Sequence, residues 1–372
     1  MGFAPLAEGY PWDQLTPYAE RARAHPGDVV DLSIGTPVDP TPAVIQEALR
    51  SGADAPGYPK AHGSPALREA ICDWFTHRRG VRGLVPEAVL PTVGSKELVA
   101  TLPSLLGLGP GDVVVVPEIA YPTYAVGARL AGAQVRSTDD VAAWADDPAV
   151  RLVWVNSPSN PTGAVRTPEQ LREVVAAARR LGAVVASDEC YAELAWAQPW
   201  AGDGVPCLLA DEVTGADHSG LLSLYSLSKQ SNLAGYRAAF AAGDPELVAQ
   251  LVLLRRHIGM IVPAPVQTAM IAALGDQAHV TDQREIYHTR RARLVPALTD
   301  AGYAVDHSEA GLYLWTRPAA GAQTCWELVA EFAERGILVG PGAFYGAAGD
   351  SHVRIALTAT DERIAAAAHR LS

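Results

Sequence analysis

Short apolar runs alternate with longer amphipathic stretches from about residue 53 to residue 242. The runs are rich in β-branched residues and end at polar, Pro or Gly positions, while several of the stretches open with a Pro at the first helical turn. We expect strands at Asp112–Val116, Arg151–Asn156, Val184–Asp188, Leu221–Tyr225 and Ala238–Ala242, and helices at Lys96–Leu106, Tyr121–Leu130, Pro168–Leu181 and Pro245–His257. The alternation predicts an α/β domain whose mostly parallel central sheet is flanked by helices.

The pattern changes after Pro263 to long helical segments followed by short strands. We expect helices at Pro263–Leu274, His279–Ala301 and Thr324–Arg335, and strands at Tyr303–His307, Leu312–Thr316 and His352–Leu357. The strand-like residues 29–34 are expected to join this part of the chain. We therefore predict a large α/β domain at residues 41–262 and a small α+β domain formed by residues 263–372 and residues 1–40, with an N-terminal arm.

Composition limits the classes of partner. Apolar residues make up 49% of the 372 residues, and no apolar run is long enough to cross a bilayer. The formal charge of −12 argues against a nucleic-acid surface, because binding to phosphate backbones depends on clustered Lys and Arg. The N-terminus has no basic stretch followed by an apolar core, so we expect a cytoplasmic protein without a secretory signal. The cysteine and histidine spacings predict no metal site.

Lysine is rare, with only Lys60, Lys96 and Lys229 among 29 basic residues. A guanidinium stays protonated, whereas an amine can lose its proton when desolvated and attack a carbonyl, so these lysines are the candidates for covalent chemistry. Lys229 follows the predicted strand Leu221–Tyr225 and should lie at the carboxyl end of that strand, where ligands bind in open α/β sheets. A solvated loop lysine is the alternative when this motif is taken alone.

Two neighbouring motifs are suited to a phosphate. Ser226 and Ser228 precede the lysine and Arg237 follows eight residues after it, which supplies hydroxyls and a guanidinium around one amine. Ser95 and Lys96, in the sequence GSKE, follow an apolar run and open a helix, whose N-terminal N–H groups attract an anion. GSKE lacks the G-K-[ST] of a Walker A loop, so a single phosphate or a simple helix cap are the two interpretations.

Polar groups for a flat ring are also present. Asp188 ends a predicted strand at the same sheet edge, and a buried carboxylate there needs a cationic partner, such as a protonated pyridine nitrogen. Tyr191 and Asn160 can donate to a phenolate oxygen, although Asn160 also suits an ordinary turn. Tyr121, just after the strand Val113–Val116, could stack on the ring or be a partly buried loop tyrosine.

Taken together, the motifs resemble a known family. The sequences GSKE, AYPTY, NSPSNPTG, SDECY, SLSKQSNLAGYR and HVRIAL occur in the order and spacing of the class I/II aminotransferases of pyridoxal 5'-phosphate fold type I. Within that family, DLSIGTPVDP, SEAGLYLW and ALTATDER are most similar to the actinobacterial succinyldiaminopimelate aminotransferases of lysine biosynthesis. The resemblance covers nearly the whole chain and implies an aminotransferase with this cofactor.

The resemblance also implies roles for single residues. Lys229 would bind the cofactor covalently and carry the proton, and Asp188 would keep the pyridine nitrogen protonated. Asn160 and Tyr191 would bind the ring oxygen, and Tyr121 would stack on the ring. The phosphate would be held by Ser95, Lys96, Ser226, Ser228 and Arg237. For Lys96, contact through its backbone N–H with the side chain in solvent stays open.

On the substrate side, the resemblance implies that Arg354 binds the α-carboxylate, assisted by Gly35 and Asn160. Tyr58 would reach the phosphate site of a neighbouring subunit, which implies a homodimer. Tyr313 and Trp315 are candidates for the distal pocket. The expected partners are amino acids and 2-oxo acids, with N-succinyl-LL-2,6-diaminopimelate and 2-oxoglutarate as the specific pair.

Two alternatives remain open at the level of sequence. Another reaction of the same cofactor, such as that of a carbon–sulfur lyase, would need the same cofactor residues. A catalytically inert ligand-binding protein is the alternative from a different class, and the intact Lys229 argues against it.

Overall fold

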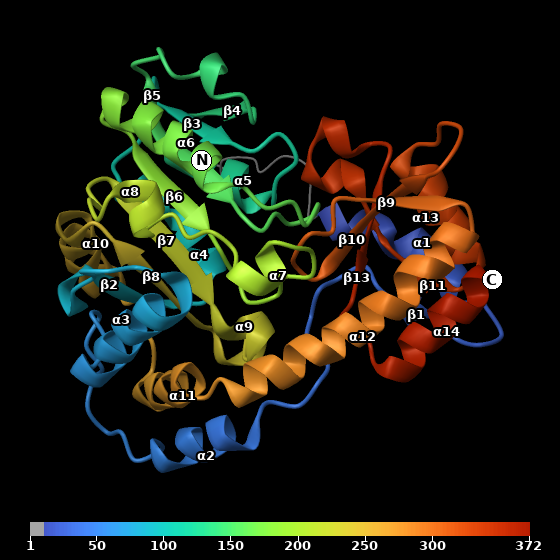
Figure 1. Cartoon of the computed structure of the whole chain (residues 1–372), viewed down its shortest axis with the longest axis horizontal. Coiled ribbons are helices and arrows are strands. Elements are labelled where there is room, and N and C mark those ends of the chain that lie inside the picture. Colours follow the sequence, from blue (N-terminus) through green and yellow to red (C-terminus); the bar gives the residue numbers. More distant parts are fainter. Residues whose placement is uncertain (1–10) are drawn as a thin grey trace, which may run out of the picture.

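A seven-stranded sheet is the centre of the computed structural model, which describes residues 11–372 (Figure 1). Its strand order is β2-β8-β7-β6-β5-β3-β4, and β8 is antiparallel to both of its neighbours, whereas all other pairs are parallel. The strands are β2 (Val89–Val93), β3 (Val113–Val116), β4 (Gln134–Ser137), β5 (Val150–Asn156), β6 (Val184–Asp188), β7 (Leu221–Ser226) and β8 (Ala238–Gly243). The predicted α/β class with a mostly parallel sheet is confirmed.

Helices cover both faces of this sheet. Alternate positions along each strand point to opposite faces, so Val114 and Val116 of β3 pack in one core cluster and Val113 and Val115 in another. The first cluster includes residues of α4 (Ser95–Leu105), α5 (Thr123–Ala131) and α10 (Pro245–Ile258). The second includes residues of α3 (Pro65–Arg79), α6 (Pro168–Leu181) and α11 (Ala264–Gly275).

A second group of elements surrounds a smaller antiparallel sheet of order β12-β13-β10-β9 and a parallel two-stranded pair of β1 and β11. The strands are β1 (Val30–Asp31), β9 (Tyr303–Asp306), β10 (Tyr313–Pro318), β11 (Ile337–Leu338), β12 (Gly340–Pro341) and β13 (Val353–Ala356). Their core is shared with α1 (Thr16–Arg23), α12 (Ala278–Asp300), α13 (Cys325–Glu334) and α14 (Asp361–Leu371). The N-terminal and C-terminal parts of the described chain therefore meet here, since β1 pairs with β11.

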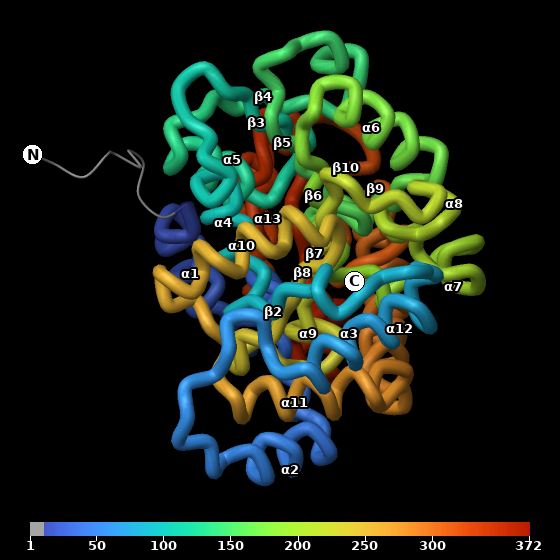
Figure 2. Tube along the Cα trace, turned by 90° about the vertical axis from the view of Figure 1, so that its left-hand side faces the viewer, coloured from blue at the N-terminus to red at the C-terminus, as the bar shows by residue number. Residues whose placement is uncertain are grey.

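The domain division at residues 41–262 stays a prediction, and residues 1–10 of its small domain lie outside the described part. Helix α11 follows the predicted boundary, yet it lies beside α2 (Ala43–Ser51) and contributes to the core of the large sheet (Figure 2). The remaining helices are short: α7 (Trp200–Asp203), α8 (Asp211–Thr214) and α9 (Leu227–Gln230). The long helix α12 runs from α9 at the large sheet to α14 in the smaller group (Figure 1).

The predicted strands and helices agree with the structure to within a few residues. Helices α1, α2, α3 and α14 and strand β4 were not predicted from the sequence. The apolar pattern does not reveal β4, because none of its positions is buried. It is an edge strand that pairs with β3 alone in the sheet, so it needs no continuous apolar run.

Candidate active site

The predicted site residues meet at one edge of the large sheet. Strands β2, β5, β6 and β7 are parallel to one another, so their carboxyl ends lie together, and antiparallel β8 begins at the same edge. The register confirms this, because Val93 pairs with Ala238 and Asn156 with Asp188. The predicted residues at or next to these strand ends therefore lie at one edge of the sheet. Asp188 and Ser226 end strands, Ser95 and Lys229 follow strands, and Arg237 precedes β8.

A cradle for an anion lies at the start of α4. Gly94 has φ +74°, and a Cβ atom placed on it would lie 2.1 Å from Nη2 of Arg237, so a glycine is needed for the guanidinium to reach this helix end. Arg237 is itself held, since its backbone oxygen accepts a hydrogen bond from the Gly94 N–H at 2.8 Å. The hydroxyls of Ser226 and Ser228 are 2.9 Å apart. The donor set and the helix N-terminus fit a phosphate.

Two further predicted residues border the cradle. The Lys96 amine lies 5.8 Å from the centre of the Tyr121 ring, so its side chain turns toward that ring. The Ser95 hydroxyl lies 3.5 Å from the Cys190 sulfur. The part of the site nearest to α4 thus combines hydroxyls, cations and one aromatic face.

Asp188 is buried at the end of β6, with a hydrogen bond to each carboxylate oxygen. Its Oδ2 accepts from the Tyr124 hydroxyl at 2.9 Å and its Oδ1 from the Cys190 N–H at 3.2 Å. Burial raises the pKa of Asp188. Within residues 11–372 no Lys, Arg or His forms an ion pair with this carboxylate, so a cationic ligand atom would compensate its charge.

Tyr124 is a site residue that sequence reasoning missed. It lies three residues after Tyr121 in the same AYPTY motif, and its fully buried ring stacks on Trp154 with the centroids 4.9 Å apart. This stacking fixes the direction in which the hydroxyl points. The signal was present in the motif, but the spacing alone does not say which of the two tyrosines turns toward Asp188.

Arg354, in β13, carries an uncompensated charge at the other side of the site. Its guanidinium is buried, donates to Asn160 Oδ1 at 3.0 Å and to the Ser33 carbonyl oxygen at 2.6 Å, and has no carboxylate partner within residues 11–372. The guanidinium lies over the Tyr313 ring, 4.0 Å from its centre, and 5.0 Å from the centre of the Tyr345 ring. A buried guanidinium with this surrounding is suited to a carboxylate ligand.

Lys229 faces the same backbone segment as Arg354. Its amine donates to the Gly35 carbonyl oxygen, two residues from the carbonyl of Ser33 that Arg354 contacts. Burial lowers the pKa of Lys229, and the positive charge of Arg354 acts in the same direction. A Cβ atom on Gly35 would lie 2.2 Å from the Tyr313 hydroxyl, so this position has room only for glycine unless Tyr313 moves.

Tyr191 and Tyr313 form a hydroxyl pair between these groups, 3.3 Å apart. Burial raises the pKa of Tyr191. Burial would also raise the pKa of Tyr313, but the charges of Arg354 and Lys229 outweigh it and lower that pKa. Trp315, expected in the distal pocket together with Tyr313, is fully buried and stacks on His352 at 4.8 Å.

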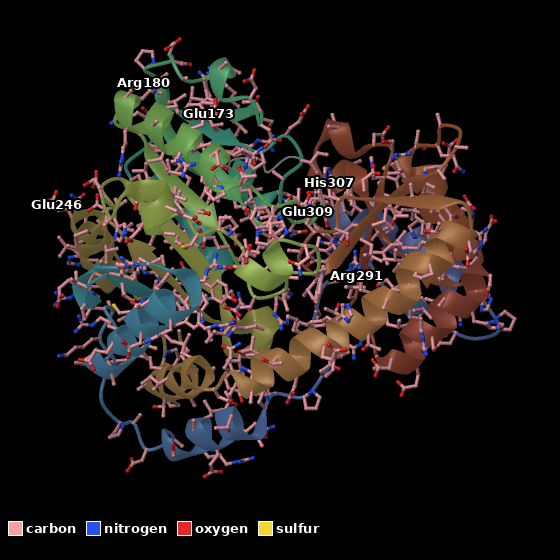
Figure 3. The ribbon with its side chains drawn as sticks, viewed as in Figure 1. Glu173, Arg180, Glu246, Arg291, His307 and Glu309 are labelled. Atoms are coloured by element: carbon pink, nitrogen blue, oxygen red, sulfur yellow. The ribbon has the colours of Figure 1, made fainter. Side chains whose placement is uncertain are left out.

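The loop between β9 and β10 links the two halves of the site. Figure 3 labels two residues of this loop, His307 and Glu309, and Arg291 on α12. The Glu309 and Ala310 N–H groups donate to the Gly163 oxygen, in the loop that carries Asn160. Arg291 donates to Ser308 Oγ at 3.0 Å from the other side. The segment leading to Tyr313 is thus fixed against the segment leading from Asn160.

Asn156, at the end of β5, shapes the Asn160 loop. Its amide nitrogen donates to the Asp188 backbone oxygen at 2.9 Å, and its side-chain oxygen accepts from the Asn160 N–H at 2.8 Å. Tyr58, in contrast, has a fully exposed side chain, so it adds nothing to the site of its own chain.

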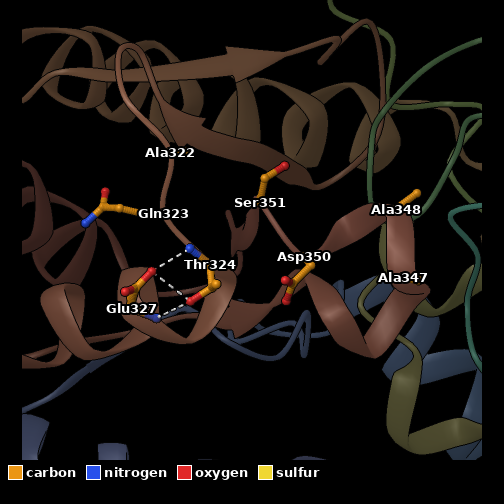
Figure 4. A pocket seen from close by; sticks show the side chains of 8 residues that line it. All are labelled: Ala322, Gln323, Thr324, Glu327, Ala347, Ala348, Asp350 and Ser351. Atoms are coloured by element: carbon orange, nitrogen blue, oxygen red, sulfur yellow. Dashed lines mark hydrogen bonds between the residues drawn. The ribbon is translucent and has the colours of Figure 1, made fainter.

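A separate pocket lies at the start of α13 (Figure 4). Thr324 and Glu327 at its edge form a capping box, in which each side chain accepts from the other residue's backbone N–H. None of its lining residues belongs to the predicted site.

Among residues 11–372, no helix combines the length and apolar character needed to cross a membrane, and no group of three His, Cys, Asp or Glu residues could bind a metal ion.

Comparison with known proteins finds aminotransferases among the relatives of this chain. Residues 27–371 match the profile of the family described as Aminotransferase class I and II. The chain is 54% identical over 364 residues to the 4-dedimethylamino-4-oxo-anhydrotetracycline transaminase OxyQ of Streptomyces rimosus, covering 98% of both chains. It is 53% identical to a probable aminotransferase of Mycobacterium tuberculosis, covering all of this chain and 88% of the relative.

Solved structures agree with these relatives. A probable N-succinyldiaminopimelate aminotransferase from Thermus thermophilus is 30% identical, with a TM-score of 0.86 over 97% of this chain and 98% of that one. A mutant of the Thermus thermophilus aspartate aminotransferase superposes with a TM-score of 0.87 at 25% identity, over 100% of this chain and 98% of that one.

Proposed function

Since this chain belongs to the class I and II aminotransferases, as its motifs predicted, we propose that it exchanges an amino group between glutamate and the 2-oxo form of N-succinyl-LL-2,6-diaminopimelate. Its fold is fold type I, its cofactor is pyridoxal 5'-phosphate, and its substrates are amino acids and 2-oxo acids. The observation that carries the proposal is the pair of buried basic groups, the Lys229 amine and the Arg354 guanidinium, that face carbonyl oxygens two residues apart. An amine and a carboxylate-binding guanidinium at this spacing suit an α-amino acid.

We assign the cofactor residues from the fit of the site. The cradle formed by Gly94, Arg237 and the α4 N-terminus would hold the phosphate, with the side chains of Ser95, Lys96, Ser226 and Ser228 around it. Asp188, which is buried and has no cationic partner within residues 11–372, would pair with the ring nitrogen. Tyr191 and Asn160 would bind the ring oxygen, Tyr121 would stack on the ring, and Lys229 would be the covalent attachment point.

The chain's own groups then carry the reaction. When bound, the cofactor supplies the electron sink for the charge that develops at the substrate Cα. Burial lowers the pKa of Lys229, which favours the neutral form of the amine that would remove and return the proton at that carbon. Arg354 and Asn160 hold the α-carboxylate and so fix which Cα bond faces the amine.

Support for a long acylated substrate comes from the segment around Gly35. Ile34 and Val38 of this segment are about half exposed, at 52% and 49%, next to the contacts of Lys229 and Arg354. These apolar side chains suit the methylene arm of a diaminopimelate derivative, while the polar site behind them holds its amino-acid end. The Thermus thermophilus structure, which is named for the corresponding substrate, agrees with this proposal.

The decisive measurement compares kcat/KM for N-succinyl-LL-2,6-diaminopimelate and for free LL-2,6-diaminopimelate at fixed 2-oxoglutarate. We expect a preference of at least roughly 100-fold for the succinylated compound, because acylation removes the charge of the distal amine, which the apolar side chains of Ile34 and Val38 would disfavour. Equal values, or a clear preference for an aromatic or sulfur amino acid, would refute this substrate and leave the aminotransferase assignment standing.

A second candidate rests on the 54% identity to the Streptomyces rimosus transaminase. That relative is named for a polycyclic ketone, 4-dedimethylamino-4-oxo-anhydrotetracycline. If this chain acts on such a ketone, the aminated form of the enzyme will be consumed by 4-dedimethylamino-4-oxo-anhydrotetracycline faster than by the 2-oxo form of N-succinyl-LL-2,6-diaminopimelate. A single-turnover comparison of the two acceptors distinguishes the candidates.

We also propose that the active enzyme is a homodimer, in which Tyr58 reaches the phosphate site of the partner subunit. The fully exposed Tyr58 side chain and the exposed Leu253, Leu254 and Ile258 on α10 support a surface that a second copy covers. Sedimentation of the holoenzyme tests this state: a monomer at micromolar concentration would refute it. The cytoplasmic location stays a prediction from the sequence.

A further inference from the structure

We propose that Asp39 is a positioning residue for substrate binding, which holds the segment of residues 33–40 so that Arg354 points at the substrate carboxylate. This inference rests on the proposed role of Arg354. Residues 33–40 contain no helix or strand, yet the Arg354 guanidinium donates to the Ser33 carbonyl oxygen and the Lys229 amine to the Gly35 carbonyl oxygen. A segment without regular structure can present two carbonyls accurately only if it is fixed at both ends.

The first end is fixed by β13 and its continuation. The Ala356 N–H donates to the Leu32 oxygen at 2.9 Å, and the Thr358 hydroxyl donates to the Ile34 oxygen at 3.2 Å. These contacts join the beginning of the segment to the chain just after Arg354. They leave the far end, from Pro37 to Pro40, to be held by other groups.

Asp39 fixes that far end through a buried ion pair. Its two carboxylate oxygens accept from Nη1 and Nη2 of Arg290 at 2.8 and 2.6 Å, a bidentate arrangement. The side chains of Arg290 and Asp39 are 3% and 14% exposed, so solvent screens the pair weakly. Nε of Arg290 donates to Asp361 at 2.7 Å, beside the C-terminal helix.

The same carboxylate is also connected to the lysine loop. Gln283 donates to Asp39 Oδ2 at 3.0 Å and accepts from the Asn232 side chain at 2.7 Å. Asn232 lies three residues after Lys229 and has φ +54°. Gln283 and Arg290 are seven residues apart on α12, which places them on one face of the helix. One helix therefore bridges the lysine loop, the segment 33–40 and the end of β13.

The first test uses Asp39→Asn in the holoenzyme, since it keeps the shape of the side chain and removes its charge. We expect KM for both substrates and the dissociation constant of succinate, a dicarboxylate that cannot react, to rise at least about tenfold. We expect kcat to fall less than about threefold and the amount of cofactor fixed to Lys229 by borohydride to stay unchanged, because the lysine is held by its own strand end. Asp39→Glu should restore part of the affinity.

Asp306→Asn is the matched control. Asp306 lies in the smaller sheet and, among the described residues, has no hydrogen bond to the segment 33–40. It pairs with Arg317 at 2.8 Å, accepts from His352 at 3.0 Å and lies opposite Trp315 on the neighbouring strand. The Asp306→Asn substitution should lower the melting temperature without changing the succinate affinity. If Asp39→Asn leaves KM and succinate binding unchanged, or if both variants weaken them equally, the positioning role is refuted.

A second variant keeps the test open if Asp39→Asn does not fold. Gln283→Met removes the side-chain bridge between Asp39 and Asn232 and keeps both the Arg290 pair and the hydrogen bonds that join Asn232 directly to Pro40 and Thr41. Succinate binding should therefore weaken by about threefold, with kcat unchanged. Unaltered binding in a folded Gln283→Met refutes the proposal. Arg354→Lys distinguishes failure of the Asp39 positioning role from failure of the Arg354 carboxylate role. If Arg354→Lys also leaves succinate binding unchanged, the proposed carboxylate role of Arg354 is refuted as well.

Discussion

The cofactor side and the substrate side of this site are built differently. Lys229, Asp188 and Arg237 come from adjacent ends of one sheet, and each is placed mainly by its own strand. Arg354, in contrast, is oriented by Ser33 and Asn160, which are 321 and 194 residues away along the chain. The cofactor side thus depends on a sheet with many parallel supports, and the substrate side depends on contacts between distant segments. Changes on the two sides should therefore affect different measured quantities.

The largest effect should come from Lys229→Ala, which removes the proposed attachment point and proton carrier on the cofactor side. We expect turnover to fall at least about 10³-fold, because Lys60 and Lys96 belong to other motifs and cannot replace it. Mass spectrometry after borohydride reduction should find no cofactor fixed to the variant. A fixed cofactor would show that another lysine is the attachment point.

Asp188→Asn should have the next largest effect, again on the cofactor side. The amide keeps the hydrogen-bonding shape but cannot compensate a protonated ring nitrogen, so turnover should fall by roughly 10²-fold while the cofactor stays bound. Equilibrium dialysis measures the bound cofactor, and stopped-flow absorbance measures the half-reaction with glutamate. Near wild-type rates would mean that Asp188 is not the partner of the ring nitrogen.

Arg354→Lys tests the substrate side. It replaces a planar fork by a point charge, and charge-assisted hydrogen bonds contribute about 1.5–3 kcal/mol, so kcat/KM for both substrates should fall roughly 10- to 100-fold. The cofactor content should not change. Arg317→Lys, in the same small sheet and paired with Asp306, is the matched control and should leave kcat/KM near the wild-type value. Unchanged kinetics in Arg354→Lys would move the carboxylate site elsewhere.

Tyr124→Phe should give the smallest effect and sharpens the assignment of the cofactor side. Loss of the hydroxyl removes one hydrogen bond of about 1 kcal/mol to Asp188, so we expect roughly a fivefold lower kcat with unchanged KM. Tyr303→Phe is the control, because the Tyr303 hydroxyl also donates to a carboxylate, Glu331 Oε1 at 2.7 Å, away from the sheet edge. Equal changes in both variants would assign the effect to general stability.

The sequence alone determined the α/β class, most strand and helix positions, and the residues at the strand ends. This was possible because a buried strand needs a continuous apolar run, and a polar residue that ends such a run lies at a sheet edge. Lys229 and Asp188 could be identified in this way from their immediate neighbours. Membership of the aminotransferase family also followed from the order of short motifs, since each motif is local.

Tertiary structure decided how the distant groups meet. Tyr124 turns toward Asp188 because its ring stacks on Trp154 of a neighbouring strand, and no local pattern records that contact. Tyr313 lies under the Arg354 guanidinium, because β10 pairs with β13 in a register that only the folded sheet sets. Asp39 meets Arg290 across 251 residues. Hydrophobic periodicity specifies which face of an element is buried, whereas partners of polar side chains depend on how the elements pack.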